Sequence, residues 1–170
     1  MPELAASPTT NRTRMVALGL LTDARLARGA ASGDRDAFAA IYERYYQPLY
    51  RYCRSLVRRP DDALDALQST RLNAMRGMEG REGELALKPW LYRIAHNESI
   101  SLLRRSPQTD ELDAEDVGVH GGVEHHAEAR ARLRQLVDDI HELPERQRGA
   151  LVMRELGGLG YDEIAAVPVA

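Results

Sequence analysis

Apolar residues recur three or four positions apart along much of the chain, which predicts helices that each bury one face. The first clear run follows Ser32-Gly33-Asp34 and continues to Leu56. Its apolar positions are Phe38, Ile41, Tyr42, Tyr45, Leu49, Tyr52, Cys53 and Leu56. Pro48 lies inside the run and is expected to break or kink it, giving two helices at an angle. The regular spacing favours a core role for most of the tyrosines over a stacking platform for bases.

A second helix is predicted to begin at Arg59-Pro60, with Asp61 and Asp62 in its first turn, where acidic groups favour the helix dipole. Its expected inner stripe consists of Leu64, Leu67, Ala74, Met75 and Met78. Asp65, Gln68 and Arg76 are expected to point away from that stripe. Three glycines, at 77, 80 and 83, then indicate a loop, and their spacing matches no phosphate-binding fingerprint.

The segment 88–105 predicts a third helix with two different faces. Pro89 suits a first helical position, and Leu91, Ile94, Ala95 and Leu102 form an apolar face. A neighbouring face carries Trp90, Arg93, Asn97, Ser101 and Arg104. Arginine can bind phosphate, and an amide can read a base edge. Composition alone favours a structural helix with a core Trp, and nucleic-acid binding is the alternative.

The second half of the chain predicts a linker followed by shorter helices. Residues 107–128 hold seven acidic residues and no Lys or Arg, which is typical of a linker. His120, His125 and His126 lack the spacing of a metal site, so no metal ligand and no cofactor are predicted. Helical spacing returns at Leu133, Leu136, Val137, Ile140 and Leu143, then from Pro144 to Leu156, and a short helix follows at Tyr161–Ala166.

These patterns predict an all-α fold with two helical modules. The expected division is a flexible arm at 1–32, a first module at 33–106, the acidic linker at 107–128 and a second module at 129–170. No apolar run reaches the roughly 20 residues that span a bilayer, so no membrane insertion is expected. Cys53 is the only cysteine, which excludes an internal disulfide and fits a reducing cytoplasm.

Charge is distributed unevenly between the two halves. Residues 1–108 carry 17 Lys or Arg and 12 Asp or Glu, whereas residues 109–170 carry 6 and 14. Five arginines and no acidic residue lie between Arg44 and Arg59. A basic first half attached to an acidic second half suggests a polyanion as partner of the first.

The order of residues in the third helix resembles the promoter-melting helix of bacterial sigma factors of the small extracytoplasmic-function (ECF) type. The similarity lies in Trp-Leu-Tyr-Arg-Ile-Ala-His-Asn, closed by Leu-Leu-Arg-Arg. The preceding Gly-Asp-Arg-Asp-Ala-Phe-Ala-Ala-Ile-Tyr and Asp62-Ala63-Leu64-Asp65 with Gln68 and Thr70 resemble the family's second region. The resemblance implies that Asp65, Gln68 and Arg76 contact the clamp coiled coil of core RNA polymerase. It also implies that Trp90, Arg93, Asn97, Ser101, Arg104 and Arg105 contact the non-template strand at the −10 element of promoter DNA.

Leu-Pro-Glu-Arg-Gln-Arg at 143–148 and Gly-Tyr-Asp-Glu-Ile-Ala at 160–165 are similar to the start of the family's fourth region. That region reads the −35 element with a helix-turn-helix, which needs a second helix in the major groove. Because only four residues follow Ala166, we expect the second module to be incompletely packed and not to recognise a −35 element.

The resemblance implies a sigma factor: a non-catalytic subunit that brings RNA polymerase to promoters and helps to open them. No nucleophile–base pair recommends an enzyme, and His96 is interpreted as a polar helix residue. One alternative is another helix-turn-helix regulator that binds duplex DNA without polymerase. A second is a sigma-like module that only binds an anti-sigma factor, which is also a candidate partner of a true sigma factor.

Overall fold

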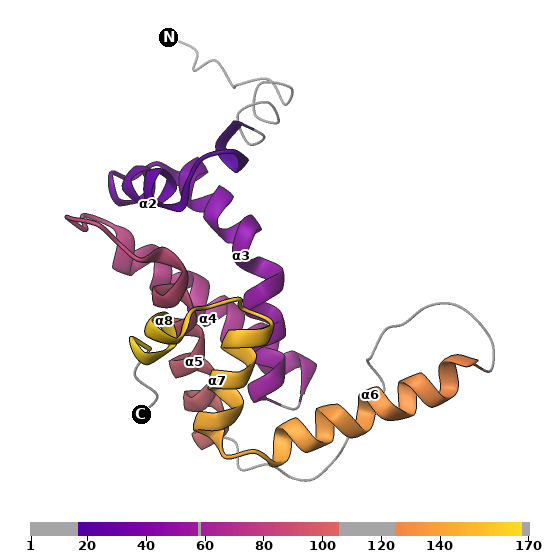
Figure 1. The fold of residues 1–170 in the computed structure, drawn as a ribbon. Helices are drawn as coiled ribbons and strands as arrows, with labels where there is room; N and C mark the ends of the chain where they lie inside the picture. Colours follow the sequence, from indigo (N-terminus) through magenta and orange to yellow (C-terminus); the bar gives the residue numbers. More distant parts are fainter. Residues whose placement is uncertain (1–16, 58, 106–124, 168–170) are drawn as a thin grey trace.

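The part of the chain that the structure describes consists of helices joined by loops and turns. This computed structural model describes residues 17–57, 59–105 and 125–167. Within these ranges every regular element is a helix, which confirms the predicted all-α class (Figure 1). The helices are α2 (Asp23–Ala31), α3 (Arg35–Leu56), α4 (Pro60–Met78), α5 (Leu87–Arg105), α6 (His125–Glu142), α7 (Glu145–Glu155) and α8 (Tyr161–Ala165). None of the described helices is long and apolar enough to cross a membrane.

Helix α2 occupies part of the segment expected to be an N-terminal arm. Leu26 is fully buried in the common core. Asp23 accepts a hydrogen bond from Arg44 Nη1 at 2.5 Å and another from the hydroxyl of Tyr45. Arg44 and Tyr45 both belong to α3. The spacing of apolar residues within 23–31 therefore could not predict that this segment packs on the rest of the protein.

Helix α3 begins at a well-formed cap, because the Asp34 carboxylate accepts hydrogen bonds from the backbone N–H groups of Asp36 and Ala37, at 2.9 and 3.2 Å. It then continues through Pro48 as one helix of 22 residues, so the prediction of two helices was wrong. Proline removes one backbone donor. The buried side chains of Tyr45 and Leu49 lie on either side of it and belong to the same core, which holds both halves in one helix.

Helix α4 buries a different stripe from the one predicted. Leu67, Ala74 and Met78 are buried as expected, but Leu64 and Met75 are 38% and 48% exposed. Their expected places in the core are taken by the smaller residues Ala63, Ala66 and Thr70. Small side chains allow the neighbouring helices to approach closely. A stripe predicted from the large hydrophobic residues alone does not include these positions.

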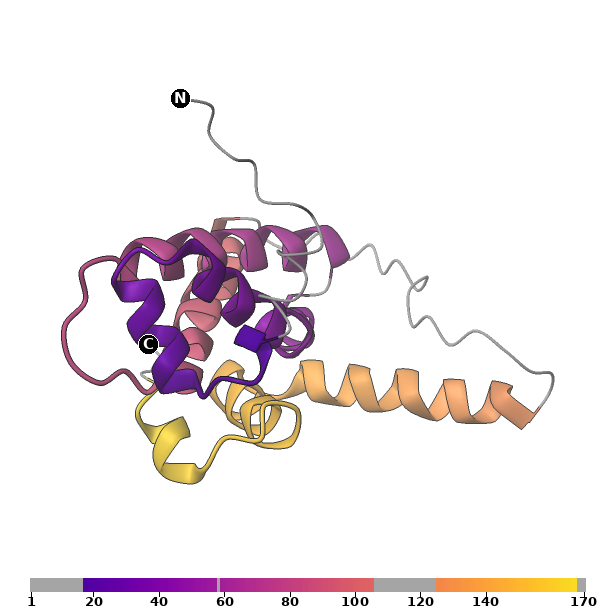
Figure 2. The ribbon, with the colours of Figure 1, turned by 90° about the horizontal axis from the view of Figure 1, so that it is seen from above.

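Helix α5 packs against both α3 and α4. The loop before it, residues 79–86, contains Gly80 and Gly83 at φ 68° and 86°, a backbone region that favours glycine. The Gly80 N–H donates to the Ala31 carbonyl oxygen at 3.0 Å, which ties the start of the loop to α2. Figure 2 shows this loop as a wide excursion that joins α4 to α5.

The C-terminal segment that contains α7 and α8 reaches the core of the earlier helices through a few buried side chains. Val152, Met153, Leu159 and Val167 are at most 3% exposed and belong to the same apolar cluster as the core of α3, α4 and α5. Helix α6 instead extends away from the other helices (Figures 1 and 2). Leu136 and Val137 on α6 are 53% and 43% exposed, and Leu151 and Leu156 in the segment of α7 are 40% and 54% exposed, so apolar side chains lie open in both parts of the predicted second module.

Candidate nucleic-acid interface

The exposed polar face of α5 is shorter than the one that the sequence suggested. Asn97, Arg104 and Arg105 are exposed, and Arg93 and Ser101 are half-buried. Trp90 is only 9% exposed and faces α4. Arg93, Asn97, Ser101 and Arg104 therefore lie along one accessible stretch of α5. The Trp90 indole, predicted to belong to the same face, lies inside the bundle instead.

Trp90 packs against Gly77 of α4, which has no side chain. A Cβ added at Gly77 would lie 3.0 Å from the indole Cζ2. The guanidinium of Arg81 lies over the same ring, 5.8 Å from its centroid. Trp90 thus anchors the end of α4 and the following loop to α5, which positions the loop beside the start of the polar face.

The guanidinium and amide groups on α5 differ in how firmly they are held. Arg105 folds back on its own helix, donating to Ser101 Oγ at 2.5 Å and to the Ser101 carbonyl oxygen at 3.2 Å. Within the described residues, Arg93, Asn97 and Arg104 have no side-chain hydrogen bond, so these donors are available to a ligand. Next to Asn97, the Asn73 amide donates to Glu98 at 2.8 Å and joins α4 to α5.

A second surface lies on the outer side of α4. Asp65, Gln68 and Arg76 are all exposed, and they lie among the exposed apolar side chains of Leu64, Leu72 and Met75. A surface that mixes apolar and polar groups on one helix suits contact with another protein. These three residues therefore share an accessible helix, separate from the polar stretch of α5.

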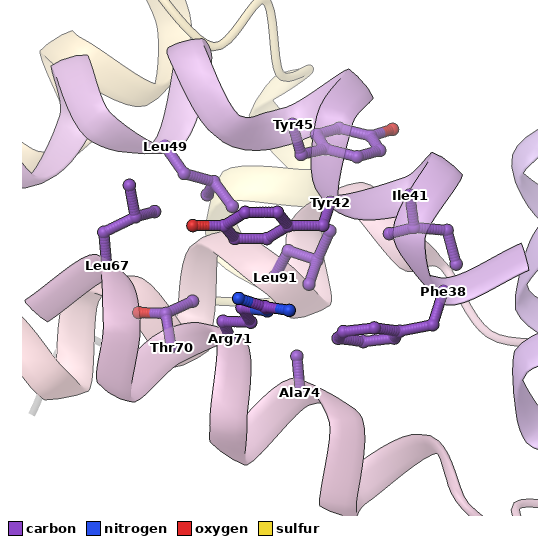
Figure 3. A pocket seen from close by; sticks show the side chains of 10 residues that line it. All are labelled: Phe38, Ile41, Tyr42, Tyr45, Leu49, Leu67, Thr70, Arg71, Ala74 and Leu91. Atoms are coloured by element: carbon purple, nitrogen blue, oxygen red, sulfur yellow. The ribbon is translucent and has the colours of Figure 1, made fainter. Parts of the chain in front are cut away.

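This surface reaches the groove between α3 and α4. Figure 3 shows Tyr42, Leu67, Thr70 and Arg71 lining a small, mainly apolar pocket there. The guanidinium of Arg71 lies 4.8 Å from the centroid of the Tyr42 ring, at a distance typical of a cation–π contact. Tyr42 in turn makes an edge contact with Tyr46, so the half-buried tyrosines of α3 border the exposed face of α4.

His96 has a role that the sequence reading missed. It is 1% exposed, its Nδ1 lies 2.9 Å from the Tyr52 hydroxyl, and its Nε2 lies 3.8 Å from Oε1 of Glu145 on α7. Burial lowers the pKa of His96, and nearby Arg104 lowers it further, whereas Glu145 opposes both effects. The signal was present in the sequence, because His96 follows Tyr92 and Ala95 at the spacing of a buried face.

Comparison with known proteins gives matches on both halves of the chain. Residues 41–109 match the family described as Sigma-70 region 2, and residues 133–167 match Sigma-70, region 4. A curated relative from Haemophilus influenzae, an ECF RNA polymerase sigma-E factor, is 36% identical over 159 residues, covering 86% of this chain and 84% of the relative. The proteins of the same description from Escherichia coli K12 and Salmonella typhimurium LT2 are each 35% identical over 162 residues, covering 86% of this chain and 83% of each relative.

Proposed function

This chain belongs to the ECF family of RNA polymerase sigma factors, and we propose that its α5 helix recognises the −10 element of promoters and helps to open it. As a sigma factor it directs RNA polymerase in transcription initiation. The observation that carries the proposal is the stretch of α5 with Asn97 and Arg104 exposed and Arg93 beside them, inside the region 2 match. Arg side chains would hold backbone phosphates, while the Asn97 amide would contact a base edge.

The energy for opening would come from capturing unstacked bases and not from nucleotide hydrolysis. Unstacking costs a few kcal/mol per base in general, and a binding site for the displaced base offsets that cost. The loop at 79–86 would supply this site, because Trp90 and Gly77 hold it beside the start of α5. The protein would thus act as a non-catalytic subunit of the polymerase, in the cytoplasm.

The exposed face of α4 would hold the polymerase. Asp65, Gln68 and Arg76 offer polar contacts to the clamp coiled coil, and Leu64 and Met75 offer apolar area between them. Because α4 and α5 pack directly on each other, binding through α4 would orient α5 toward the DNA at the same time. An anti-sigma factor that covered either helix would block the activity.

Run-off transcription with core polymerase on a promoter library tests the proposal. The protein should produce transcripts from a subset of promoters that share a −10 sequence, and core polymerase alone should not. A matched variant with Arg93→Ala, Asn97→Ala and Arg104→Ala should still bind core but lose open complexes. If the wild-type protein bound duplex DNA without core, it would be a different kind of regulator. If it bound only an anti-sigma factor and supported no transcripts, it would be a sequestering module.

A further inference from the structure

The outer face of α2 carries an open pocket lined by Arg25, Arg28, Gly29 and Ser32, which we call the α2 pocket. Arg25 and Arg28 are three positions apart, so they share one face of the helix, and both are exposed. Arg28 Nε donates to the Ala24 carbonyl oxygen at 3.3 Å, and Ser32 Oγ donates to the Gly29 carbonyl oxygen at 2.9 Å. The donors left for a ligand are therefore those of the two guanidinium groups.

The charge of the α2 pocket is positive. Among the described residues that line it, none is acidic. Asp23, on the same helix, accepts hydrogen bonds from Arg44 and from Tyr45 of α3. The Asp34 carboxylate accepts hydrogen bonds from backbone N–H groups at the start of α3. Because both of these carboxylates are held by α3, they do not pair with the guanidinium groups of the pocket.

The C-terminal end of α2 repels an anion less than a bare helix end. The last carbonyl oxygens of a helix carry partial negative charge when they have no partner. Here the carbonyl oxygens of residues 28–31 each accept a backbone N–H, from Ser32, Gly33 or Gly80. Arg28 adds a positive charge in the last turn. An anion at the α2 pocket thus meets two guanidinium groups and no free carbonyl oxygen of the last turn.

The α2 pocket is next to the loop that we propose for base capture. The Gly80 N–H donates to the Ala31 carbonyl oxygen at 3.0 Å, which joins the loop at 79–86 to the end of α2. Helix α2 also packs against α4 and α5. Figures 1 and 2 both show it beside this loop, at the end of the bundle where α5 begins. A strand that passes the loop therefore comes close to α2.

The loop itself is poorly suited to hold phosphate groups. Glu79, Glu82 and Glu84 are all exposed. The guanidinium of Arg81, the only basic residue of the loop, lies over the Trp90 ring. Like charges repel, so a base can enter the loop only if cations elsewhere hold the backbone on either side of it. The polar stretch of α5 supplies such cations on one side, and α2 supplies them on the other.

The direction of the strand decides which nucleotides reach α2. The −35 element lies upstream and is read as duplex DNA, so the unpaired strand continues downstream of the −10 element. With the upstream part of the element on the polar stretch of α5 and the displaced base in the loop, the next nucleotides pass α2. We propose that the α2 pocket binds the phosphate backbone of the non-template strand immediately downstream of the −10 element. This inference rests on the function proposed for α5.

Two single strands of different length test the α2 pocket. One ends at the downstream edge of the −10 element, and the other continues for about six nucleotides, within the length that a single-strand site covers. Both are titrated by fluorescence anisotropy into the complex of the full chain with core polymerase. The wild-type complex should bind the long strand more tightly than the short one. Arg25→Ala combined with Arg28→Ala should remove most of that gain and leave the affinity for the short strand unchanged.

Salt dependence and base sequence identify the kind of contact. For single strands, each lost phosphate contact makes the slope of the logarithm of the binding constant against the logarithm of salt concentration shallower by about 0.7. The double variant should therefore lose about 1.4 of slope on the long strand and none on the short one. Phosphate contacts do not read bases, so extensions of thymine and of adenine should lose affinity equally.

Two further pairs of substitutions are matched controls. Arg51→Ala with Arg59→Ala removes the same charge from exposed positions outside the pocket and should keep the gain from the extension. Arg59 precedes α4, whose other end leads into the loop about 27 Å away at about 1.5 Å per residue. Arg25→Lys with Arg28→Lys keeps the charge and should retain most of the gain, because a lysine also binds phosphate as a point charge.

The outcomes separate the α2 pocket from the function proposed for α5. Equal gain from the extension in the wild type and the Arg25/Arg28 alanine variant would overturn the inference, and so would equal affinity of the wild type for both strands. In both cases, binding of the short strand would leave the α5 proposal standing. Loss of both strands in the alanine variant would show a general defect and also overturn the inference. If the wild-type complex bound neither strand, the proposed function and this inference would fail together.

Discussion

Nδ1 of His96 and the hydroxyl of Tyr52 share a hydrogen bond of 2.9 Å that joins α5 to α3 beneath α7. Both side chains are essentially inaccessible to solvent. In the tautomer that carries its proton on Nε2, the imidazole accepts this bond from Tyr52. The pair fixes the angle between two core helices at the place where the C-terminal helices rest.

Tyr52→Phe should lower the free energy of unfolding by about 1–3 kcal/mol, because it leaves Nδ1 of His96 buried without a partner. Urea unfolding followed by circular dichroism measures the change. Tyr50→Phe is the control, since Tyr50 is half-buried and has no hydrogen bond within the described residues. Equal stability of the two variants would show that the Tyr52 hydroxyl contributes nothing.

Acidification should destabilise the protein through His96. Burial lowers the pKa of His96 below its ordinary value of about 6.5, with Arg104 acting in the same direction and Glu145 opposing. The unfolded chain therefore binds a proton more readily than the folded one. The stability contributed by neutral His96 is present above about pH 6.5 and falls as pH drops below that value.

Unfolding free energies measured from pH 7.5 down to pH 5.5 check this sign. His96→Gln keeps a polar side chain near Tyr52 but cannot titrate, so its stability should fall less steeply with acidification than that of the wild type. Other titrating groups affect both proteins alike. If the unfolding free energies of the wild type and of His96→Gln fell in parallel with pH, His96 would not be the cause of the loss of stability.

Gly77→Leu should displace the only tryptophan of the chain. The added Cβ would lie 3.0 Å from Cζ2 of Trp90, and the rest of the leucine needs space that the indole fills. We expect a red-shifted emission and a loss of about 1–3 kcal/mol of stability from overpacking. Glu79→Leu, at an exposed position nearby, should leave the emission unchanged. An unshifted spectrum of the Gly77 variant would contradict the packing of α4 on Trp90.

Asp65→Ala combined with Gln68→Ala should weaken binding to core polymerase with a change in stability of no more than about 0.5 kcal/mol, because both side chains are exposed. Fluorescence anisotropy with labelled core measures the affinity. Leu67→Ala is the contrasting variant on the same helix: Leu67 is 1% exposed, so its loss should cost about 2–5 kcal/mol of stability. Wild-type affinity in the double variant would remove Asp65 and Gln68 from the polymerase surface.

Arg104→Ala and Asn97→Ala should have different effects on −10 binding. Loss of a phosphate contact at Arg104 should reduce affinity for all sequences. It should also make the slope of the logarithm of the binding constant against the logarithm of salt concentration shallower by about one. Loss of the Asn97 amide should reduce the difference in affinity between −10 strands of different base sequence and leave the salt slope unchanged. Titrations of the polymerase complex with −10 single strands at several salt concentrations distinguish them. Identical behaviour of both variants would place the DNA elsewhere.

Much of the fold was predictable because its signals are local. Helical spacing marks α3, α4 and α5, and Asp34 and Pro60 mark two helix starts through backbone chemistry that involves only near neighbours. The order of residues in α5 also sufficed to identify the family resemblance, which the two sigma region matches confirm. Family and fold class were therefore determined by the sequence.

The tertiary structure decided which of the suitable residues are accessible. Trp90 and Asn97 lie on one helix, yet Trp90 is buried because α4 presents the bare backbone of Gly77 to it. Leu64 is exposed while Ala63 beside it is buried, since adjacent positions on a helix face different directions and the neighbouring helices cover only one of them. The environment of His96 depends on Tyr52 and on Glu145, which are 44 and 49 positions away in the chain. Helical periodicity describes one helix at a time, whereas burial and hydrogen bonding depend on which helices meet.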